Sequence, residues 1–362
     1  MKTTLTLKQL WVAAVTSACV LLAGCSDNKT EQTQATPMQN DTVYFYNWSE
    51  YMPDGILEQF TEETGIKVIY TTFDSNEAMY SKLKLLDGKG YDIVVPSTYF
   101  INKMRDENLI QPIDQSKITN FKHLDKALLD QAYDPGNQYS IPYTWGITAI
   151  GVNSDAIDPS SITSWKDLWD PKLQNSILLM NDVREVFHMA LRINGHSANT
   201  TDEAEIEQAY QTLKPLMDNV LVFNSDTPGL PFLAGEVNLG MLWNGSAFTA
   251  QQENPAITMV YPKEGAVLWM DSMAITSGAQ NVEGAHKLID FLLRPEIAAK
   301  ISEEIGYPSP VESAKPLMPE EYRNNPLIYP PQEVKDAGEF HNDIGEAELI
   351  YDKYWQKLRS GR

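Results

Sequence analysis

Residues 42–73 read TVYFYNWSEYMPDGILEQFTEETGIKVIYTTF, which predicts a strand, a helix and a second strand in succession. Residues 42–48 and 67–73 are rich in β-branched and aromatic residues, and these residue types favour strands. Between them, residues 53–65 predict a helix with Pro53 near its start and Gly65 as its stop signal. This order is typical of a βαβ unit with parallel strands.

The same alternation continues along the chain. Helices are predicted at residues 76–86, 99–108, from about 184, 202–219, 283–293, 295–306 and 343–360, and extended segments at residues 91–96, 139–155, 176–182, 220–226, 237–245 and 259–275. The pattern predicts an α/β fold with a mainly parallel sheet. At 362 residues the chain is long enough for two hydrophobic cores. The elements fall into two α/β bodies, and no polar linker separates them. We therefore expect strands near residues 148–152 and 271–274 to cross between the two bodies.

The first 24 residues predict a signal peptide. Lys2 and Lys8 precede an apolar stretch that is too short to span a membrane. The stretch ends in LAGC, residues 22–25, which resembles the lipobox of bacterial lipoproteins, so Cys25 is the expected lipidated first residue of the mature chain. The alternative is an ordinary signal peptide that happens to contain a cysteine. Residues 26–41 are polar and predict a flexible tether.

Composition narrows the classes of partner. The formal charge is −21, and removal of two lysines with the signal peptide makes it −23. This balance argues against nucleic acid and anionic membrane surfaces as partners and is compatible with a cationic ligand, although many acidic proteins carry such charge for solubility alone. Cys19 also leaves with the signal peptide. The mature chain therefore has no intrachain disulfide and no cysteine-based metal site.

No catalytic motif is present. The chain lacks G-x-S-x-G, H-E-x-x-H, a P-loop and a dinucleotide-binding glycine fingerprint. The five histidines are scattered without the spacing of metal ligands. We expect neither a metal nor a cofactor, and no enzyme activity.

Aromatic residues recur beside acids at predicted strand ends. Trp48 lies near Glu50 in YNWSEY, and Trp269 lies two residues from Asp271 in GAVLWMDS, which places both on one face of an extended strand. In open α/β sheets, ligands bind beyond the carboxyl ends of the strands. Each residue alone also has a structural interpretation, Glu50 as a solvated turn residue and Trp269 as a core residue.

A third acidic cluster occurs in NDVRE, where Asp182 and Glu185 start a helix. Asp182 alone could be an N-cap. Together the clusters suit a linear polyamine, in which ammonium groups alternate with methylene segments. Carboxylates would neutralise the ammoniums, and aromatic walls would cover the methylenes and attract the charges.

Long segments of the chain resemble the spermidine/putrescine-binding proteins of bacterial ABC transporters. The resemblance rests on YFYNWSEYMPDGILEQFTEETGIKVIY, YDIVVPSTYF, SWKDLWDPKLQNSILLMNDVREVFHMAL, FNSDTPGLPFLAGEVNLGMLWNGSAF, PKEGAVLWMDSMAI and IGYPSP, and it covers residues 42–362. It implies a two-lobed periplasmic-binding-protein fold of the class with two crossovers, with the ligand in the cleft between the lobes. Lobe 1 would comprise residues 42–148 and 272–315, and lobe 2 residues 149–271 and 316–362.

The resemblance also implies a set of ligand-binding residues. The aromatic residues are Trp48, Tyr51, Tyr99, Trp243, Trp269 and Tyr307, and the acids are Glu50, Asp182, Glu185 and Asp271. Glu185 and Asp271 would bind one amino end, Asp182 an inner amine and Glu50 the other end. Ser49 stands where the family often has threonine. His341 stands where spermidine binders commonly have glutamine, and a histidine accepts a hydrogen bond from an amine only when it is neutral.

The sequence thus predicts a monomeric polyamine-binding protein that delivers its ligand to an inner-membrane ABC permease. Spermidine is favoured over putrescine, because an acid between the two ends suits a triamine. The expected location is the periplasm or another extracytoplasmic space, with Cys25 as the membrane anchor. The alternative is a sensor of the same fold that signals through a membrane protein.

Overall fold

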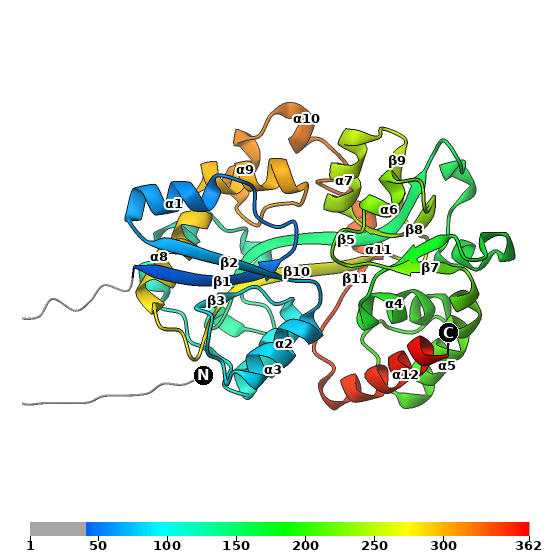
Figure 1. Cartoon of the computed structure of the whole chain (residues 1–362), viewed down its shortest axis with the longest axis horizontal. Helices are drawn as coiled ribbons and strands as arrows, with labels where there is room; N and C mark the ends of the chain where they lie inside the picture. Colours follow the sequence, from blue (N-terminus) through cyan, green and yellow to red (C-terminus); the bar gives the residue numbers. More distant parts are fainter. Residues whose placement is uncertain (1–40, 362) are drawn as a thin grey trace, which may run out of the picture. The chain divides into compact units, whose positions relative to one another are not determined.

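The computed structural model describes residues 41–361 (Figure 1). Its first elements are β1 (Thr42–Trp48), α1 (Ile56–Thr64) and β2 (Lys67–Phe73), as the opening stretch predicts. The glycines on either side of α1, Gly55 and Gly65, have φ of 83° and 73°, which a residue with a Cβ rarely adopts. The two strands pair in parallel, so this segment forms the expected βαβ unit.

The remaining predicted elements are present with shifts at their ends, but the helices Leu230–Leu233, Asn244–Glu253, Glu320–Arg323 and Gln332–Ala337 and the strands Ile110–Gln111 and Glu339–Phe340 were not predicted. The further strands are β3 (Ile93–Val94), β4 (Ile110–Gln111), β5 (Ile141–Asn153), β6 (Ile177–Leu179), β7 (Val220–Phe223), β8 (Leu239–Trp243), β9 (Ile257–Val260), β10 (Val267–Thr276) and β11 (Glu339–Phe340). The further helices are α2 (Asn76–Leu85), α3 (Thr98–Asp106), α4 (Val183–Ile193), α5 (Glu203–Leu213), α6 (Leu230–Leu233), α7 (Asn244–Glu253), α8 (Val282–Leu292), α9 (Pro295–Ile305), α10 (Glu320–Arg323), α11 (Gln332–Ala337) and α12 (Glu348–Ser360).

Two predicted helices are shorter than expected. The helix predicted at residues 202–219 ends at Leu213, and a 3-10 turn containing Pro215 replaces its last part, because proline cannot donate the backbone hydrogen bond of a continuing α-helix. The last helix begins at Glu348 and not at residue 343. Gly345 has a φ of 57° in the 3-10 turn before it.

Strand β10 joins two halves of one sheet. The strand order is β2-β1-β3-β10-β5-β8-β6-β7, and β10 also pairs with β4 and β11 while β9 pairs with β5. The C-terminal end of β10 pairs antiparallel with β3 and β4, whereas the residues before it pair antiparallel with β5. Because β5 also pairs antiparallel with β8 and β9, the sheet is mixed, and the prediction of a mainly parallel sheet is wrong. Figure 1 shows β5 and β10 running side by side from the part of the protein that contains β1–β3 to the part that contains β7 and β8.

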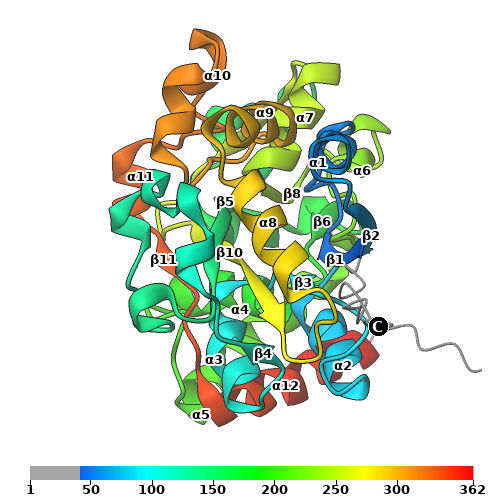
Figure 2. The ribbon, with the colours of Figure 1, turned by 90° about the vertical axis from the view of Figure 1, so that its left-hand side faces the viewer.

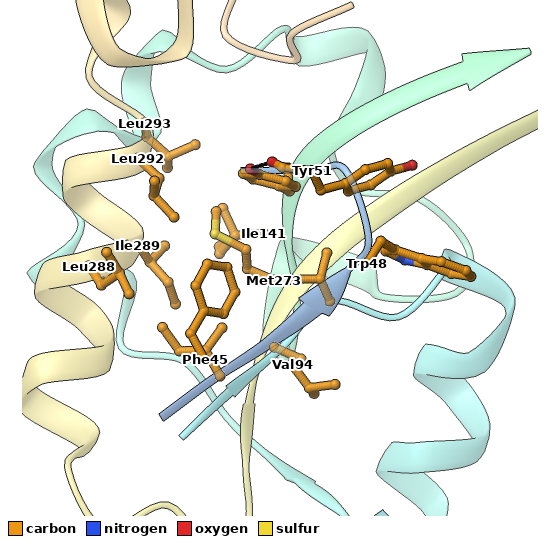
Figure 3. Close-up of a cluster of buried hydrophobic side chains, with 14 of the residues drawn as sticks. Phe45, Trp48, Tyr51, Val94, Ile141, Met273, Leu288, Ile289, Leu292 and Leu293 are labelled. Carbon is orange, nitrogen blue, oxygen red and sulfur yellow. Dashed lines mark hydrogen bonds between the residues drawn. The ribbon is translucent and has the colours of Figure 1, made fainter. Parts of the chain in front are cut away.

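The hydrophobic residues form separate cores in these two parts. The first core contains residues of β1, β3, α8 and α9. Figures 2 and 3 show α8 packed against the part of the sheet that contains β1 and β3. Leu288, Ile289 and Leu292 of α8 point toward Phe45 of β1 (Figure 3). Two further cores lie around β5–β8, one with α4, α5 and α12 and the other with α7. On β5, the side chain of Tyr143 belongs to the first core and that of Ile150 to the second.

None of the described helices has the length and apolar character needed to cross a membrane.

Candidate ligand-binding site

A cavity that is partly open to solvent lies where the two parts of the protein face each other. The space between its side chains that protein atoms do not fill, open solvent included, is about 350 Å³. The lining residues are Trp48, Tyr51, Asn76, Ser97, Tyr99, Asp182, Glu185, Trp243, Trp269, Asp271 and His341. Nine of these eleven residues are among the site residues predicted from the sequence. Residues that are up to 293 positions apart in the chain therefore meet at one place.

The ends of strands and helices position these side chains. Trp48 is the last residue of β1, and Trp243 is the last residue of β8. Asp182 is the N-cap of α4, and Tyr99 lies in the first turn of α3. Figure 3 shows Trp48 at the tip of the β1 arrow, with Tyr51 in the loop that follows. The cavity lies beyond the carboxyl ends of β1 and β8, where open α/β sheets bind ligands.

Asp271 is the most deeply buried acid of the cavity, with 2% of its surface exposed. Its Oδ2 accepts a hydrogen bond from the Tyr51 hydroxyl at 2.9 Å, and its Oδ1 accepts one from the Ser97 hydroxyl at 2.6 Å. Burial raises the pKa of Asp271 to about 7, although these two hydrogen bonds act in the opposite direction. The hydroxyls hold the carboxyl group in place without supplying a positive charge.

Trp269 lies on the same face of β10 as Asp271. Its indole Nε1–H donates to the Thr148 hydroxyl at 3.2 Å, and that hydroxyl in turn donates to Oε1 of Glu185 at 2.9 Å. Gly146 of β5 lies opposite Trp269, and a Cβ at this position would lie 2.3 Å from its Cζ2. The glycine therefore leaves the space that the indole occupies.

Among the described residues, only one of the two carboxylate oxygens of Glu185 accepts hydrogen bonds. Its Oε1 also accepts from the indole Nε1–H of Trp243 at 3.2 Å. Its Oε2 is buried and has no hydrogen-bond partner among the described residues. Burial, followed by the negative charge of Asp182, raises the pKa of Glu185 to about 8. A buried oxygen without a partner is costly, and an ammonium ligand would remove that cost.

Asp182 is the N-cap of α4, as its position in the sequence allows, and it also lines the cavity. Its Oδ1 accepts from the backbone N–H of Glu185 at 3.0 Å, which caps α4. Burial raises its pKa, while the backbone hydrogen bond and the charge of Arg184 lower it. The Arg184 guanidinium itself donates to the carbonyl oxygens of Ala198 and Asn342 and to the Asn199 side chain.

Among residues 41–361, the three buried acids of the cavity, Asp182, Glu185 and Asp271, form no ion pair. Keeping three carboxylates ionised in a cavity is unfavourable unless positive charge enters with them. This arrangement can therefore bind a compact polycation.

Three tryptophans and two tyrosines form the walls. The Trp48 ring centroid lies 6.2 Å from those of Tyr51 and Trp243. Trp48 also has a buried Nε1–H without a hydrogen-bond partner among the described residues. Tyr99 completes the wall on the α3 side and accepts a hydrogen bond from Asn76 at 2.9 Å. Such ring faces cover methylene groups and attract ammonium groups.

Three of the predicted site residues do not line the cavity. Tyr307 lies behind its wall, with its ring edge-on to Trp269 at 5.2 Å and tilted to Tyr51 at 5.3 Å. Ser49 donates to Oδ1 of Asp226 at 2.5 Å. Glu50 is exposed, with a φ of 60°. The surrounding protein atoms and then the charge of Asp226 raise the pKa of Glu50 to about 7.

Two lining residues, Asn76 and Ser97, were not predicted. Asn76 donates to the Ser97 hydroxyl at 3.0 Å, and its Oδ1 accepts from the backbone N–H of Ser97 at 3.0 Å. Ser97 then donates to Asp271, so Asn76 supports the acid from one residue away. Ser97 lies two positions before Tyr99 in PSTYF, and this was the only signal in the sequence that could have found it.

The wall next to Tyr99 contains a histidine pair. His341 follows β11 and lines the cavity, and its ring lies edge-on to Tyr99 at 5.9 Å. His188 of α4 lies behind it, with Nδ1 at 3.3 Å from Nε2 of His341. The family resemblance in the sequence points to His341 but assigns no role to His188.

Comparison with known proteins identifies the class. The model of the bacterial extracellular solute-binding protein family matches residues 55–330. The chain belongs to this family, and it is an extracytoplasmic binding protein and not an enzyme.

The relatives within the family are more specific. The chain is 58% identical to the spermidine/putrescine-binding periplasmic protein of Escherichia coli strain K12 over 323 residues, which cover 89% of this chain and 93% of the relative. The solved spermidine/putrescine ABC transporter substrate-binding protein of Streptococcus pneumoniae is 36% identical, with a TM-score of 0.74 over 88% of this chain and 99% of that chain. A solved lipoprotein of Treponema pallidum is 30% identical, with a TM-score of 0.79 over 88% and 99% of the two chains. The resemblance and the two-lobed α/β fold predicted from the sequence are thus confirmed.

Proposed function

We propose that this protein binds a linear polyamine, with spermidine preferred over putrescine, and delivers it to an ABC importer. The observation that carries the proposal is a cavity with tryptophan walls and three buried acids that form no ion pair with any described residue. The relatives named for spermidine and putrescine support the same ligand class.

The predicted roles of the acids fit the contacts of the cavity. Glu185 has a free Oε2, and Asp271 can bind an ammonium with the oxygen lone pairs that Tyr51 and Ser97 leave unused. We assign these two acids to one amino end and Asp182 to an inner amine. We assign Glu50, at the exposed edge, to the other end. Tyr307 would act by holding Trp269 and Tyr51 in place.

The lobes are proposed to follow the predicted division. Lobe 1 comprises residues 42–148 and 272–315, and lobe 2 comprises residues 149–271 and 316–362. Contacts such as the ion pair between Lys103 of α3 and Glu348 of α12 then join the two lobes around an enclosed ligand. We further propose that the protein is a monomer.

Cys25 is proposed as the lipid anchor that holds the protein in the periplasm or at another extracytoplasmic membrane surface. Residues 1–40 lie outside the described part of the chain, so the support comes from the LAGC tetrapeptide and from the related lipoprotein. Mass spectrometry should find a lipid on wild-type protein and none on Cys25→Ser, which should leave the membrane fraction. An unlipidated wild-type chain would contradict this assignment.

Calorimetry tests the ligand. The full-length protein in detergent is titrated with putrescine, spermidine, norspermidine and spermine. Spermidine should bind more tightly than putrescine, because it fills the inner subsite at Asp182 as well as the ends. If no polyamine binds more tightly than about 1 mM, equivalent to roughly 4 kcal/mol, the proposed ligand class is wrong.

A further inference from the structure

His188 is a buried histidine that does not line the cavity but contacts one that does. It is fully buried on α4, one helical turn after Glu185. Its Nδ1 lies 3.3 Å from Nε2 of His341, which is 4% exposed and lines the cavity. His188 can therefore affect a ligand through the ring of His341.

Both histidines are held in the neutral form. Burial, followed by the charges of Arg192 and Arg184, lowers the pKa of His188 to about 3. Burial, the charge of Arg184 and the neighbouring His188 lower the pKa of His341 well below its usual value. Each ring then has one N–H and one bare nitrogen.

The contact between the two rings couples their tautomers. A hydrogen bond between His188 Nδ1 and His341 Nε2 needs one proton, which belongs to one ring or the other. If His341 donates through Nε2–H, its other nitrogen, Nδ1, is a bare acceptor. If His188 donates through Nδ1–H, the proton of His341 must lie on Nδ1, which is then a donor.

We propose that His188 is a positioning residue that accepts the Nε2–H of His341 and so leaves Nδ1 of His341 as a hydrogen-bond acceptor for the ligand. This inference rests on the proposed function. The nitrogens of a polyamine at neutral pH are ammonium groups that only donate hydrogen bonds. An N–H at Nδ1 of His341 would therefore place a hydrogen-bond donor against the donors of the ligand. Because Arg184 places a positive charge close to both rings, the wall contributes a neutral lone pair and not a second cation.

The tautomer can be measured directly. Imidazole ¹⁵N NMR of the full-length protein, with His341 assigned through His341→Gln, should show a protonated Nε2 and a bare Nδ1, both without ligand and with spermidine. A protonated Nδ1 in His341 would overturn the inference. The measurement without ligand remains decisive even if the protein binds no polyamine, which is the outcome that contradicts the proposed function.

Two variants of His188 distinguish a role in orienting the His341 ring from a role in packing. His188→Gln keeps an acceptor for the Nε2–H, whereas His188→Met fills similar space without an oxygen or nitrogen acceptor. Spermidine should bind about tenfold more weakly to His188→Met, because the His341 ring loses the hydrogen bond that fixes it, and nearly normally to His188→Gln. Equal affinity of all three proteins would overturn the inference. If His188→Met does not fold, the NMR result on the wild-type protein decides.

Discussion

Two acids at opposite edges of the site, Asp271 and Glu50, differ in their exposure to solvent. At the enclosed edge, Asp271 is 2% exposed and is held by Tyr51 and Ser97. At the open edge, Glu50 is exposed on a turn beside Asp226. Asp271 is almost out of contact with water, whereas Glu50 is exposed, although the surrounding protein atoms and Asp226 raise its pKa to about 7. A carboxylate that has lost its water should contribute more to ligand binding than one that remains solvated.

The largest effect should come from removing the charge at the enclosed edge. Asp271→Asn keeps the size and an acceptor oxygen but leaves an ammonium poorly paired, which should weaken spermidine binding by roughly 2–5 kcal/mol in calorimetry. Asp87→Asn is the matched control, because it removes one charge from a side chain that is 87% exposed. Unchanged affinity in Asp271→Asn would remove Asp271 from the site.

A smaller effect is expected from pH. Burial raises the pKa of Asp271 to about 7 and that of Glu185 to about 8 in the ligand-free protein. Protonation of these groups competes with an ammonium ligand, so spermidine should bind more weakly at pH 6 than at pH 8, by about tenfold from Asp271 alone, and binding near pH 7 should release protons. Calorimetry in buffers of different ionisation enthalpy measures this release.

The same shifts predict the stability of the ligand-free protein. A carboxyl group with a raised folded-state pKa stabilises the fold fully below its unfolded value, near pH 4, and this contribution is lost as the pH rises through about 7–8. Spermidine should therefore raise Tm more at pH 8 than at pH 5.5. An equal rise in Tm at pH 5.5 and pH 8 would contradict the proposal that a bound cation neutralises the buried acids.

The smallest effect is expected at the open edge. Glu50→Gln should weaken spermidine binding by no more than about 1 kcal/mol, because an exposed ion pair gains little over solvation. Added salt should remove most of the difference between Glu50→Gln and wild type in calorimetry. A loss as large as that of Asp271→Asn would show that Glu50 becomes enclosed when ligand binds, and the two edges would then no longer differ.

Local patterns in the sequence were enough for most of the long strands and helices, but they missed the helix Asn244–Glu253. The spacing of Trp269 and Asp271 places both on one face of β10, and the resemblance supplied the residues from distant segments. The end of α5 was missed because the apolar pattern continues past Leu213, although Pro215 stops the α-helix.

Contacts across the fold account for the rest. Ser97 reaches Asp271 over 174 positions of sequence, and His188 meets His341 over 153, so no local pattern contains either contact. Tyr307 was expected in the wall, but it packs one layer behind the residues that form it. A family pattern names the residues of a site, but the layer in which each one lies follows from three-dimensional packing.

Gly146 shows how such a binding site could diversify. The Trp269 indole occupies the volume where a methyl group on residue 146 would lie. A single added carbon on β5 would therefore require the ring, which lines the cavity, to shift. Evolution or a protein engineer could thus change the shape of the cavity from a glycine in its supporting strand, while every acid of the cavity stays unchanged.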